Sequence, residues 1–421
     1  MQATKCVTQP YLHGILDIVL RDCLTTTYSA VHYGKENGID NRKGMKEFYR
    51  TLKETSLLSC YKVAAITRAC MVLKSRKKSE RRGVEVRYPK PLAPMVCIIS
   101  GFFVTMKGRL FIPIRRDEYV DVQLNDHIIR TLEGKKIRSL TITPGSLSFC
   151  YSEEVESIPV RTIYGVDRNE KNITFGNRER VVRIDLNEMV RMRQTTREIL
   201  GSFKRNDVRM RRKLARKYWK RATDRSNQML HAAANFMVRT AVRSGAALAL
   251  EDLTHIRRMY RRGSGESEDY RFRLNSWPHW KAKRMLEYKA AWKGVTVISL
   301  TKSETYGSSS MCSACGEKLH IPAKGDVVHK RMLWCQACKV WIDRDVNAAL
   351  NLSQRGLARF ASSLPKPVSR SQQESFEAED NGLAGEAVKG NGTQQTLILR
   401  VDASKLTHRL TVDTTVGHSR S

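Results

Sequence analysis

Four cysteines stand in two pairs whose spacing is typical of a metal site. Cys312 and Cys315 form one Cys-x2-Cys motif, Cys335 and Cys338 form the other, and 19 residues separate the two motifs. Together they offer four thiolates, the number that tetrahedral zinc takes in structural sites. Residues 306–342 hold few apolar side chains, so their folding would need metal binding, worth about 10–16 kcal/mol in small zinc modules. Redox pairs are the alternative, but thioredoxin-like motifs occur singly. The sequence therefore predicts one structural Zn²⁺.

Three carboxylates stand where predicted elements end or begin. Asp167 and Glu251 each follow a predicted strand, and Asp345 opens a predicted helix. Acids at such positions can meet at one edge of a sheet, and carboxylates that close together require cations to stay ionised. Two Mg²⁺ ions do this in nucleases, where one activates water and the other stabilises the leaving oxygen. Each acid alone could equally be a helix cap or a strand end, and Asp252 and Asp343 are neighbouring alternatives.

The charge of the chain favours a polyanionic partner. The 75 Lys and Arg residues outnumber the 42 Asp and Glu residues, which gives a net charge of +33. Such a field attracts nucleic acid, although ribosomal and membrane-surface proteins are basic too. The predicted nucleic-acid contacts lie on the basic helix 204–221 or in the loop after Glu251, where a solvated loop is the alternative. They are Arg209, Arg211, Arg212, Lys213, Arg216, Lys217, Lys220, Arg221, Arg257 and Arg258.

No apolar run approaches the roughly 20 residues of a membrane span, and residues 1–14 lack the pattern of a secretory signal. We expect a cytoplasmic, nucleoid-associated protein without a membrane partner. Its other six cysteines are then reduced and are expected to be small buried hydrophobes. They are Cys6, Cys23, Cys60, Cys70, Cys97 and Cys150.

The elements that must position these residues follow from periodicity. Residues 11–85 read as helical, and two hairpins follow around Lys107-Gly108 and Pro144-Gly145. The later pattern is mixed α/β. It predicts strands at 162–166, 173–175, 246–250 and 295–300, a helix capped by Asp185 and Glu188, a helix from 204 to 244, and a helix from Asp345 that ends at Gly356.

Five motifs in one order resemble a known family. They are Gly165-Val-Asp167, Leu250-Glu-Asp-Leu253, Cys312-Ser-Ala-Cys-Gly316, Cys335-x2-Cys338 and Asp343-Arg-Asp-Val-Asn347-Ala-Ala. They look like the RuvC-like nuclease half of the TnpB (OrfB) proteins of insertion-sequence transposons, relatives of the miniature type V CRISPR effectors. Asn275-Ser-Trp-Pro-His-Trp and Glu304-Thr-Tyr-Gly-Ser extend the resemblance on either side of the last strand.

The resemblance implies a fold that is α/β plus α+β. An RNase H-like (RuvC) core with an inserted zinc ribbon would follow a β-barrel-like domain with a helical insertion. The implied division is a helical recognition region at 1–90, a β-rich wedge-like domain at 91–160, the nuclease core at 161–305, the zinc insertion at 306–342, the last RuvC motif at 343–360 and a mostly disordered tail at 361–421.

The resemblance also implies a function. Asp167, Glu251 and Asp345 match the family's three magnesium-binding acids. Family members cut double-stranded DNA under the direction of a guide RNA from their own transposon end, and guide pairing leaves the protein to hold an A-form heteroduplex. Oligomeric state stays open. The alternatives are a catalytically weak RNA-guided DNA-binding protein and a transposase or transposition accessory, although no HUH-type His pair is present.

Two features depart from the family pattern. Arg168-Asn169 follows the first acid, where the family commonly has small residues. Family members usually open with a strand, and MQATKCVTQP is a poor candidate for one. Either the N-terminal β domain is incomplete, or the start of the sequence is wrongly assigned.

Overall fold

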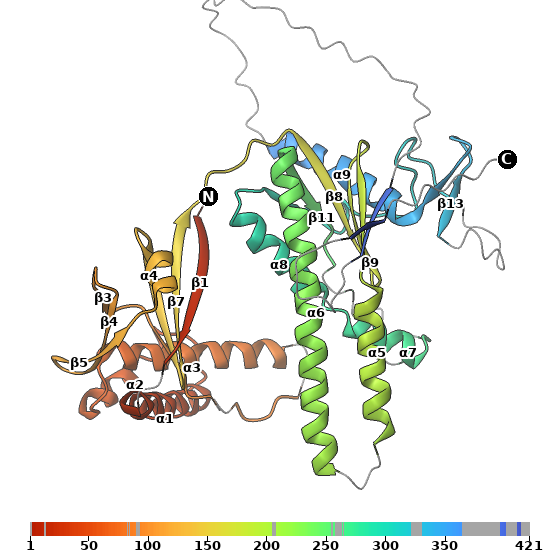
Figure 1. Cartoon of the computed structure of the whole chain (residues 1–421). Helices are drawn as coiled ribbons and strands as arrows, with labels where there is room; N and C mark the ends of the chain where they lie inside the picture. Colours follow the sequence, from red (N-terminus) through yellow and green to blue (C-terminus); the bar gives the residue numbers. More distant parts are fainter. Residues whose placement is uncertain are drawn as a thin grey trace, which may run out of the picture. The chain divides into compact units, whose positions relative to one another are not determined.

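The computed structural model describes residues 2–11, 14–81, 83, 85–89, 93–203, 208–253, 256, 263, 265–320, 331–363, 396–400 and 411–413. At 210, 211, 363, 396–400 and 411–413 it describes the backbone alone. The chain folds as two compact units, Gln2–Glu154 and Val155–Ser421 (Figure 1). No helix among the described residues has the length and apolar character needed to cross a bilayer.

The first unit contains a four-stranded antiparallel sheet in the order β1-β7-β6-β2. Its strands are β1 (Gln2–Pro10), β7 (Ser146–Glu154), β6 (Lys136–Thr143) and β2 (Val96–Ile98). The expectation that residues 1–10 are a poor candidate for a strand is wrong, because β1 pairs with β7 along its whole length. The inward side of β1 carries Ala3, Val7 and the amide Gln9, whose Nε2 donates to Gln123 O at 3.2 Å. An inward amide hides the apolar alternation by which strands are recognised.

The outer face of the same sheet carries cysteines. Cys6 on β1 and Cys97 on β2 are exposed, and Cys150 on β7 is partly buried. Cys60, outside this sheet, is also partly buried, so only Cys23 and Cys70 are the buried hydrophobes expected. Side chains alternate between the two faces of a strand, so a cysteine one position away from a buried residue faces outward.

A second, smaller sheet completes the β part of this unit. It consists of β3 (Phe103–Val104), β4 (Arg109–Arg115) and β5 (Glu118–Gln123), followed by α4 (Asp126–Leu132). Both predicted hairpins are present, and Gly108 and Gly145 adopt the positive φ angles of 72° and 84° that favour glycine in tight turns. The apolar run 96–106 is divided between β2 and β3.

The other helices of the first unit lie between β1 and β2 in the sequence. They are α1 (Gly14–Glu36), α2 (Lys46–Thr51) with a short 3-10 turn at Leu52–Glu54, and α3 (Ser59–Glu80). Leu16 and Leu20 of α1 and Tyr61 of α3 share one core with Phe149 of β7. The Tyr61 hydroxyl donates to Pro113 O at 2.7 Å and satisfies its buried oxygen.

The second unit is built on one mixed sheet with the strand order β12-β11-β8-β9-β10-β15-β16. The bounds are β8 (Thr162–Arg168), β9 (Asn172–Gly176), β10 (Val181–Asp185), β11 (Ala246–Leu250), β12 (Val297–Ser299), β15 (Thr396–Arg400) and β16 (Thr411–Asp413). β8, β9 and β10 are antiparallel neighbours, whereas β11 runs parallel to both β8 and β12. These pairings confirm the strands predicted at 162–166, 173–175 and 246–250.

Helices cover both faces of this sheet. The helices are α5 (Asn187–Ser202), α6 (Val208–Ser244), α7 (Glu268–Ser276), α8 (His279–Ala291) and α9 (Arg344–Ser363). On β11, Leu248 and Leu250 pack with α6 and α8, whereas Ala247 and Ala249 pack with Leu352 of α9 (Figure 1). The predicted long basic helix is confirmed as α6, and it ends before Gly245 at a φ of 57°.

Two predicted helix boundaries are wrong. α5 begins at Asn187, because Asp185 is still paired with Asn172 as the last residue of β10. α9 continues through Gly356, where an added Cβ would lie 2.5 Å from the Cβ of Ala249. This glycine lets the helix approach β11 and does not end it.

Little of the predicted disordered tail 361–421 belongs to the described residues. Those that do form the end of α9 and the strands β15 and β16, which continue the sheet beyond β10. Residues 364–395, where the composition predicts disorder, lie outside the described residues.

Candidate metal centres and nucleic-acid surface

The four cysteines converge on one point. Cys312 Sγ lies 3.9 Å from Cys338 Sγ, Cys315 Sγ lies 3.4 Å from Cys335 Sγ, and the four sulfur atoms lie within 4.8 Å of one another. Four thiolates about 2.3 Å from a tetrahedral zinc ion would lie about 3.8 Å apart. The hairpin of β13 (Met332–Cys335) and β14 (Val340–Asp343) presents the second pair. The donor set and its spacing therefore fit one four-coordinate metal ion.

Polar side chains of α9 hold the first cysteine segment. Asn347 Nδ2 donates to Met311 O at 2.7 Å, and its Oδ1 accepts from Ser313 N at 2.8 Å. Asn351 Nδ2 also donates to Met311 O at 2.7 Å, and Gln354 Nε2 donates to Ser313 O at 2.8 Å. The cysteine module is thus attached to the helix that begins beside Asp345.

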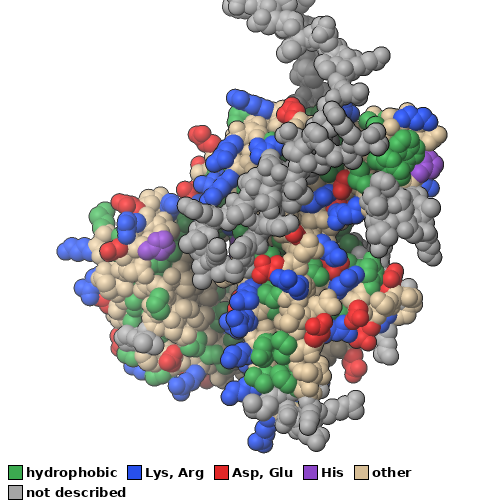
Figure 2. All heavy atoms as spheres, turned by 45° about the vertical axis from the view of Figure 1, so that its right-hand side comes forward, with side chains coloured by type: hydrophobic (Ala, Val, Ile, Leu, Met, Phe, Trp, Pro, Cys, Tyr) green, Lys and Arg blue, Asp and Glu red, His purple; other side chains and the backbone are tan. Residues whose placement is uncertain are grey.

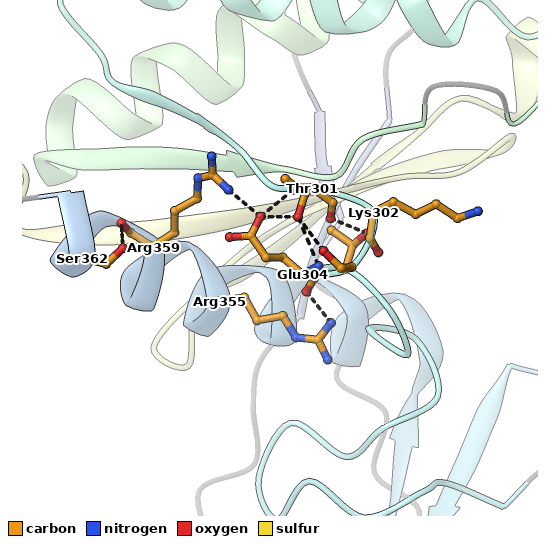
Figure 3. A network of polar contacts seen from close by, with 8 residues as sticks. Thr301, Lys302, Glu304, Arg355, Arg359 and Ser362 are labelled. Atoms are coloured by element: carbon orange, nitrogen blue, oxygen red, sulfur yellow. Dashed lines mark hydrogen bonds and ion pairs between the residues drawn. The ribbon is translucent and has the colours of Figure 1, made fainter.

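The next turns of α9 hold the loop that leads into the module (Figure 3). Arg359 pairs with the Glu304 carboxylate, and Arg355 donates to Glu304 O at 2.9 Å and to Tyr306 O at 2.8 Å. Glu304 Oε2 also accepts from Thr301 N at 2.7 Å. The hydrogen bonds from Arg359 and Thr301 lower the pKa of Glu304 to about 2. The Glu304-Thr-Tyr-Gly-Ser motif is therefore an anchoring loop, which ties the segment before the module to α9. The four-residue spacing of polar residues on α9 could have indicated this role.

Asp167 and Glu251 lie at the same edge of the sheet. Val166 pairs with Leu250 between the parallel strands β8 and β11. Each acid is the residue that follows one member of this pair, so the two acids lie at the same end of the two strands. Asp167 is buried, and burial together with the charge of Glu251 raises the pKa of Asp167 to about 7. Burial also raises the pKa of Glu251. Two partly desolvated carboxylates at one edge form a site suited to a hard cation.

Asp345 lies in the first turn of α9 and is buried. Its Oδ2 accepts from Asn172 Nδ2 at 3.0 Å and pairs with the guanidinium of Arg331. Asp343 has a different environment: its Oδ1 accepts from the backbone N–H groups of Asp345 and Val346 at 2.9 and 3.1 Å. Asp343 therefore caps α9, which leaves Asp345 as the acid of this pair whose carboxylate is not engaged in capping.

Arginines surround the acids. Arg183 pairs with Asp343 and lies 3.9 Å from Asp345 Oδ2, and the buried Arg168 donates to Glu251 O at 2.7 Å. Among the residues that the structure describes, only the cysteines form a group of three or more metal-ligating side chains within 4.8 Å. The acids Asp167, Glu251 and Asp345 therefore do not form such a group, and arginine guanidinium groups lie beside them. Sequence analysis missed the roles of Asn172, Arg183 and Arg331.

The predicted nucleic-acid contacts lie mainly on α6. Exposed side chains there are Arg209, Arg212, Lys213, Arg216, Lys217, Lys220 and Arg221. Of these, Lys220 pairs with Asp224 at 3.1 Å within the described residues. The side chain of Arg211 and the whole of Arg257 and Arg258 lie outside the described residues. Figure 2 shows Lys and Arg side chains spread over the visible face of the molecule.

A cavity of about 330 Å³ lies between α5 and α6. Arg191 of α5 and Tyr218, Arg221 and Arg225 of α6 are among its lining residues. The three arginines and Glu188, which also lines the cavity, give it charged walls.

Sequence comparisons identify relatives of this chain. A family model described as the TNB domain of Cas12f1-like proteins matches residues 279–352, which include both cysteine pairs and Asp345. The TnpB-like protein MJ0751 of Methanocaldococcus jannaschii is 30% identical over 229 residues, which are 52% of this chain and 78% of that protein. A Streptomyces pristinaespiralis protein named "Putative RNA-guided DNA endonuclease" is 33% identical over 170 residues, 40% of this chain and 37% of that protein.

A solved structure shares the fold. A Cas12f1 protein in complex with sgRNA and target DNA superposes with a TM-score of 0.51, covers 80% of this chain and 81% of its own, and is 14% identical. The superposition shows that the two proteins share a fold, and residues 279–352 match the Cas12f1-like family model. The identity and coverage shared with the archaeal relative are more specific. The chain belongs to the TnpB family.

Proposed function

We propose that this protein is a transposon-encoded, RNA-guided DNA endonuclease with an RNase H-like (RuvC) core. The observation that carries the proposal is the position of Asp167 and Glu251 at one edge of the sheet, with Asp345 tied to β9 beside it. The raised pKa of Asp167 and Glu251 agrees with a site whose carboxylates are completed by cations. The names of the relatives support nucleic acid as the substrate class.

Asp167, Glu251 and Asp345 would hold Mg²⁺, which supplies an activated water and stabilises the leaving oxygen of a phosphodiester when bound. The chain's own residues prepare that site. Arg183 and Arg331 pair with Asp343 and Asp345 and offset the charges of these two acids before cations bind. The capping of α9 by Asp343 fixes the backbone from which Asp345 projects.

The four cysteines would hold a structural Zn²⁺ without a part in the chemistry, since four protein ligands leave no open position. Through Asn347 and Asn351 the zinc module would brace the start of α9 and so Asp345. The guide RNA and the target DNA would run along the basic surface of α6, because guide pairing leaves the protein to bind backbone phosphates. The first unit would hold the RNA scaffold and read the motif that flanks the target.

A catalytically weak, RNA-guided DNA-binding protein is the second candidate. One observation favours it: the guanidinium of Arg331 is paired with Asp345 Oδ2, so the charge of this carboxylate is already offset. In the nuclease proposal the cation binds Asp345 through Oδ1, or Arg331, whose side chain is 48% exposed, leaves Oδ2 when cations and substrate bind.

Cleavage by the purified complex tests the choice. The RNA that copurifies with the protein is sequenced, a matching target DNA is built, and cutting is followed with and without Mg²⁺. We expect Mg²⁺-dependent cutting that Asp345→Ala abolishes while RNA binding stays within about twofold, because the acid contributes to chemistry and not to guide recognition. Asp343→Asn is the matched control, since an amide oxygen can still cap α9. Guided binding without cutting by the wild type would establish the second candidate.

A further inference from the structure

The turn between β8 and β9 contacts every one of the three acids. Arg168 donates to the backbone carbonyl of Glu251 at 2.7 Å, and Asn169 Nδ2 donates to Asp167 Oδ2 at 2.6 Å. Asn172, at the other end of the turn, donates to Asp345 Oδ2 at 3.0 Å. A single five-residue segment thus supplies a separate donor to acids that lie on a strand end, after a second strand and on a helix.

The turn is itself held in place. The buried Trp277 donates from Nε1 to Glu170 O at 2.8 Å, and Arg273 Nε lies 3.3 Å from Glu170 Oε1. Leu186 N donates to Lys171 O at 2.7 Å, and Asn169 N donates to Asn172 O at 2.9 Å. Because backbone and side-chain bonds fix both ends and the middle, the three donors have defined positions.

Burial makes these donors effective. Arg168 and Asn172 are 4% and 3% exposed, and the guanidinium of Arg168 lies among the charges of Asp167 and Glu251. Hydrogen bonds to a carboxylate are stronger than those between neutral groups, and they gain strength where water is excluded. The turn therefore restrains a carboxylate oxygen of Asp167 and of Asp345 and the backbone of Glu251, and does more than connect two strands.

We propose that Arg168, Asn169 and Asn172 are positioning residues that orient Glu251, Asp167 and Asp345 for cation binding. This inference rests on the proposed nuclease site. Each of the three contacts one acid. The acids come from three distant segments of the chain, but a single turn holds all of them in place. Residues that orient metal ligands in this way typically contribute about 10–100-fold to metal affinity.

Mn²⁺ binding to the purified protein–RNA complex tests the inference, with detection by electron paramagnetic resonance. The part of the binding that Asp167→Ala and Asp345→Ala remove defines the acid site and separates it from Mn²⁺ on the RNA. Asn172→Ala and Asn169→Ala are each expected to weaken that part about 10–100-fold. Guide RNA content and thermal midpoint are expected to stay near those of the wild type.

Asn177 provides a matched control in the next turn of the same sheet. It is 7% exposed, donates to Thr162 Oγ1 at 3.0 Å and accepts from Glu179 N and Arg180 N, and these bonds involve no acid of the site. Asn177→Ala removes a buried amide as Asn172→Ala does, but it is expected to leave Mn²⁺ affinity unchanged. An equal loss in both variants would overturn the inference, because general destabilisation would then explain both.

Conservative substitution adds a second readout. Arg168→Lys keeps the charge and is expected to retain more affinity than Arg168→Met. Wild-type Mn²⁺ affinity in Asn169→Ala and Asn172→Ala would overturn this inference but leave the proposed function standing. Wild-type affinity in the Asp167 and Asp345 variants sinks the proposed function instead.

Discussion

The cysteine site and the acid site are assembled in different ways. The cysteines come from one segment, 312–338, and their sulfur atoms already lie at the spacing of a tetrahedral ion. The acids come from three distant segments and lie beside Arg168, Arg183 and Arg331. A site of four soft thiolates depends on its metal for folding, whereas a site neutralised by arginines can fold first and take up cations later.

The strongest way to break this comparison is to remove a cysteine. Cys335→Ser is expected to abolish zinc binding and to unfold the module, since structural zinc supplies about 10–16 kcal/mol in comparable modules. Metal content by mass spectrometry and proteolysis of residues 312–343 would show both effects. Asp345→Ala is the control and should keep one zinc per chain. A Cys335→Ser module that resists proteolysis would show that the two sites fold alike.

The pH dependence sharpens the acid side of the comparison. Burial and Glu251 raise the pKa of Asp167 to about 7, so its protonated form predominates below that pH. Without cations, the contribution of Asp167 to the free energy of unfolding is fully present below the pKa of a free Asp, and it is lost as pH rises through about 7. Cation binding requires the ionised form, so cleavage is expected to fall about tenfold per pH unit below 7. Rates between pH 5 and 8 at fixed Mg²⁺ would test this, and a flat profile would contradict it.

The helix shared by both sites offers a third test. Gly356→Ala places a methyl group 2.5 Å from Ala249 Cβ and 3.1 Å from Ile163 Cγ2, so we expect a loss of about 1–3 kcal/mol in unfolding free energy. Gly201→Ala on α5, where an added Cβ meets nothing within 4 Å, should instead stabilise by up to about 1 kcal/mol. Denaturant titration of both variants measures the difference. Equal effects would show that α9 does not pack closely on β11.

The smallest effect is expected at the anchoring loop. Arg359→Ala removes an exposed ion pair with Glu304, which is worth about 0–1 kcal/mol in solvent. Because this pair lowers the pKa of Glu304, its contribution is present above the ordinary Glu pKa and is lost as pH falls towards 2. Thermal melting at pH 7 and pH 3 would detect it. A larger destabilisation at pH 3 than at pH 7 would contradict this assignment.

Much of the core could be predicted from local pattern. The apolar runs at 162–166 and 246–250 are buried on both faces, so they read as strands, and Asp167 and Glu251 follow directly from their ends. The helical period of α6 is equally local. Features that depend on distant partners could not be predicted. Gln9 of β1 is satisfied by residues of β5 and the segment after it, and Gly356 is explained only by the approach of Ala249.

The site shows the same division. The spacing of the cysteines predicts their convergence because the motif is nearly self-contained. The cap that Asp343 forms and the contact between Asn172 and Asp345 could not be predicted, since both are visible only in three dimensions. Arg331 and Arg183 could not be found from sequence, because nothing near them in the chain marks their partners.

The row of polar side chains along α9 also has a consequence for motion. Asn347, Asn351, Gln354 and Arg355 bond to the backbone of the module and its entry loop. A fluctuation that opens the module must break these bonds, so its amide protons and those of the first turns of α9 should exchange with solvent as one cooperative unit. Local opening of the cysteine module would then loosen the backbone of Asp345 in the same event, and the lifetime of one site would limit that of the other.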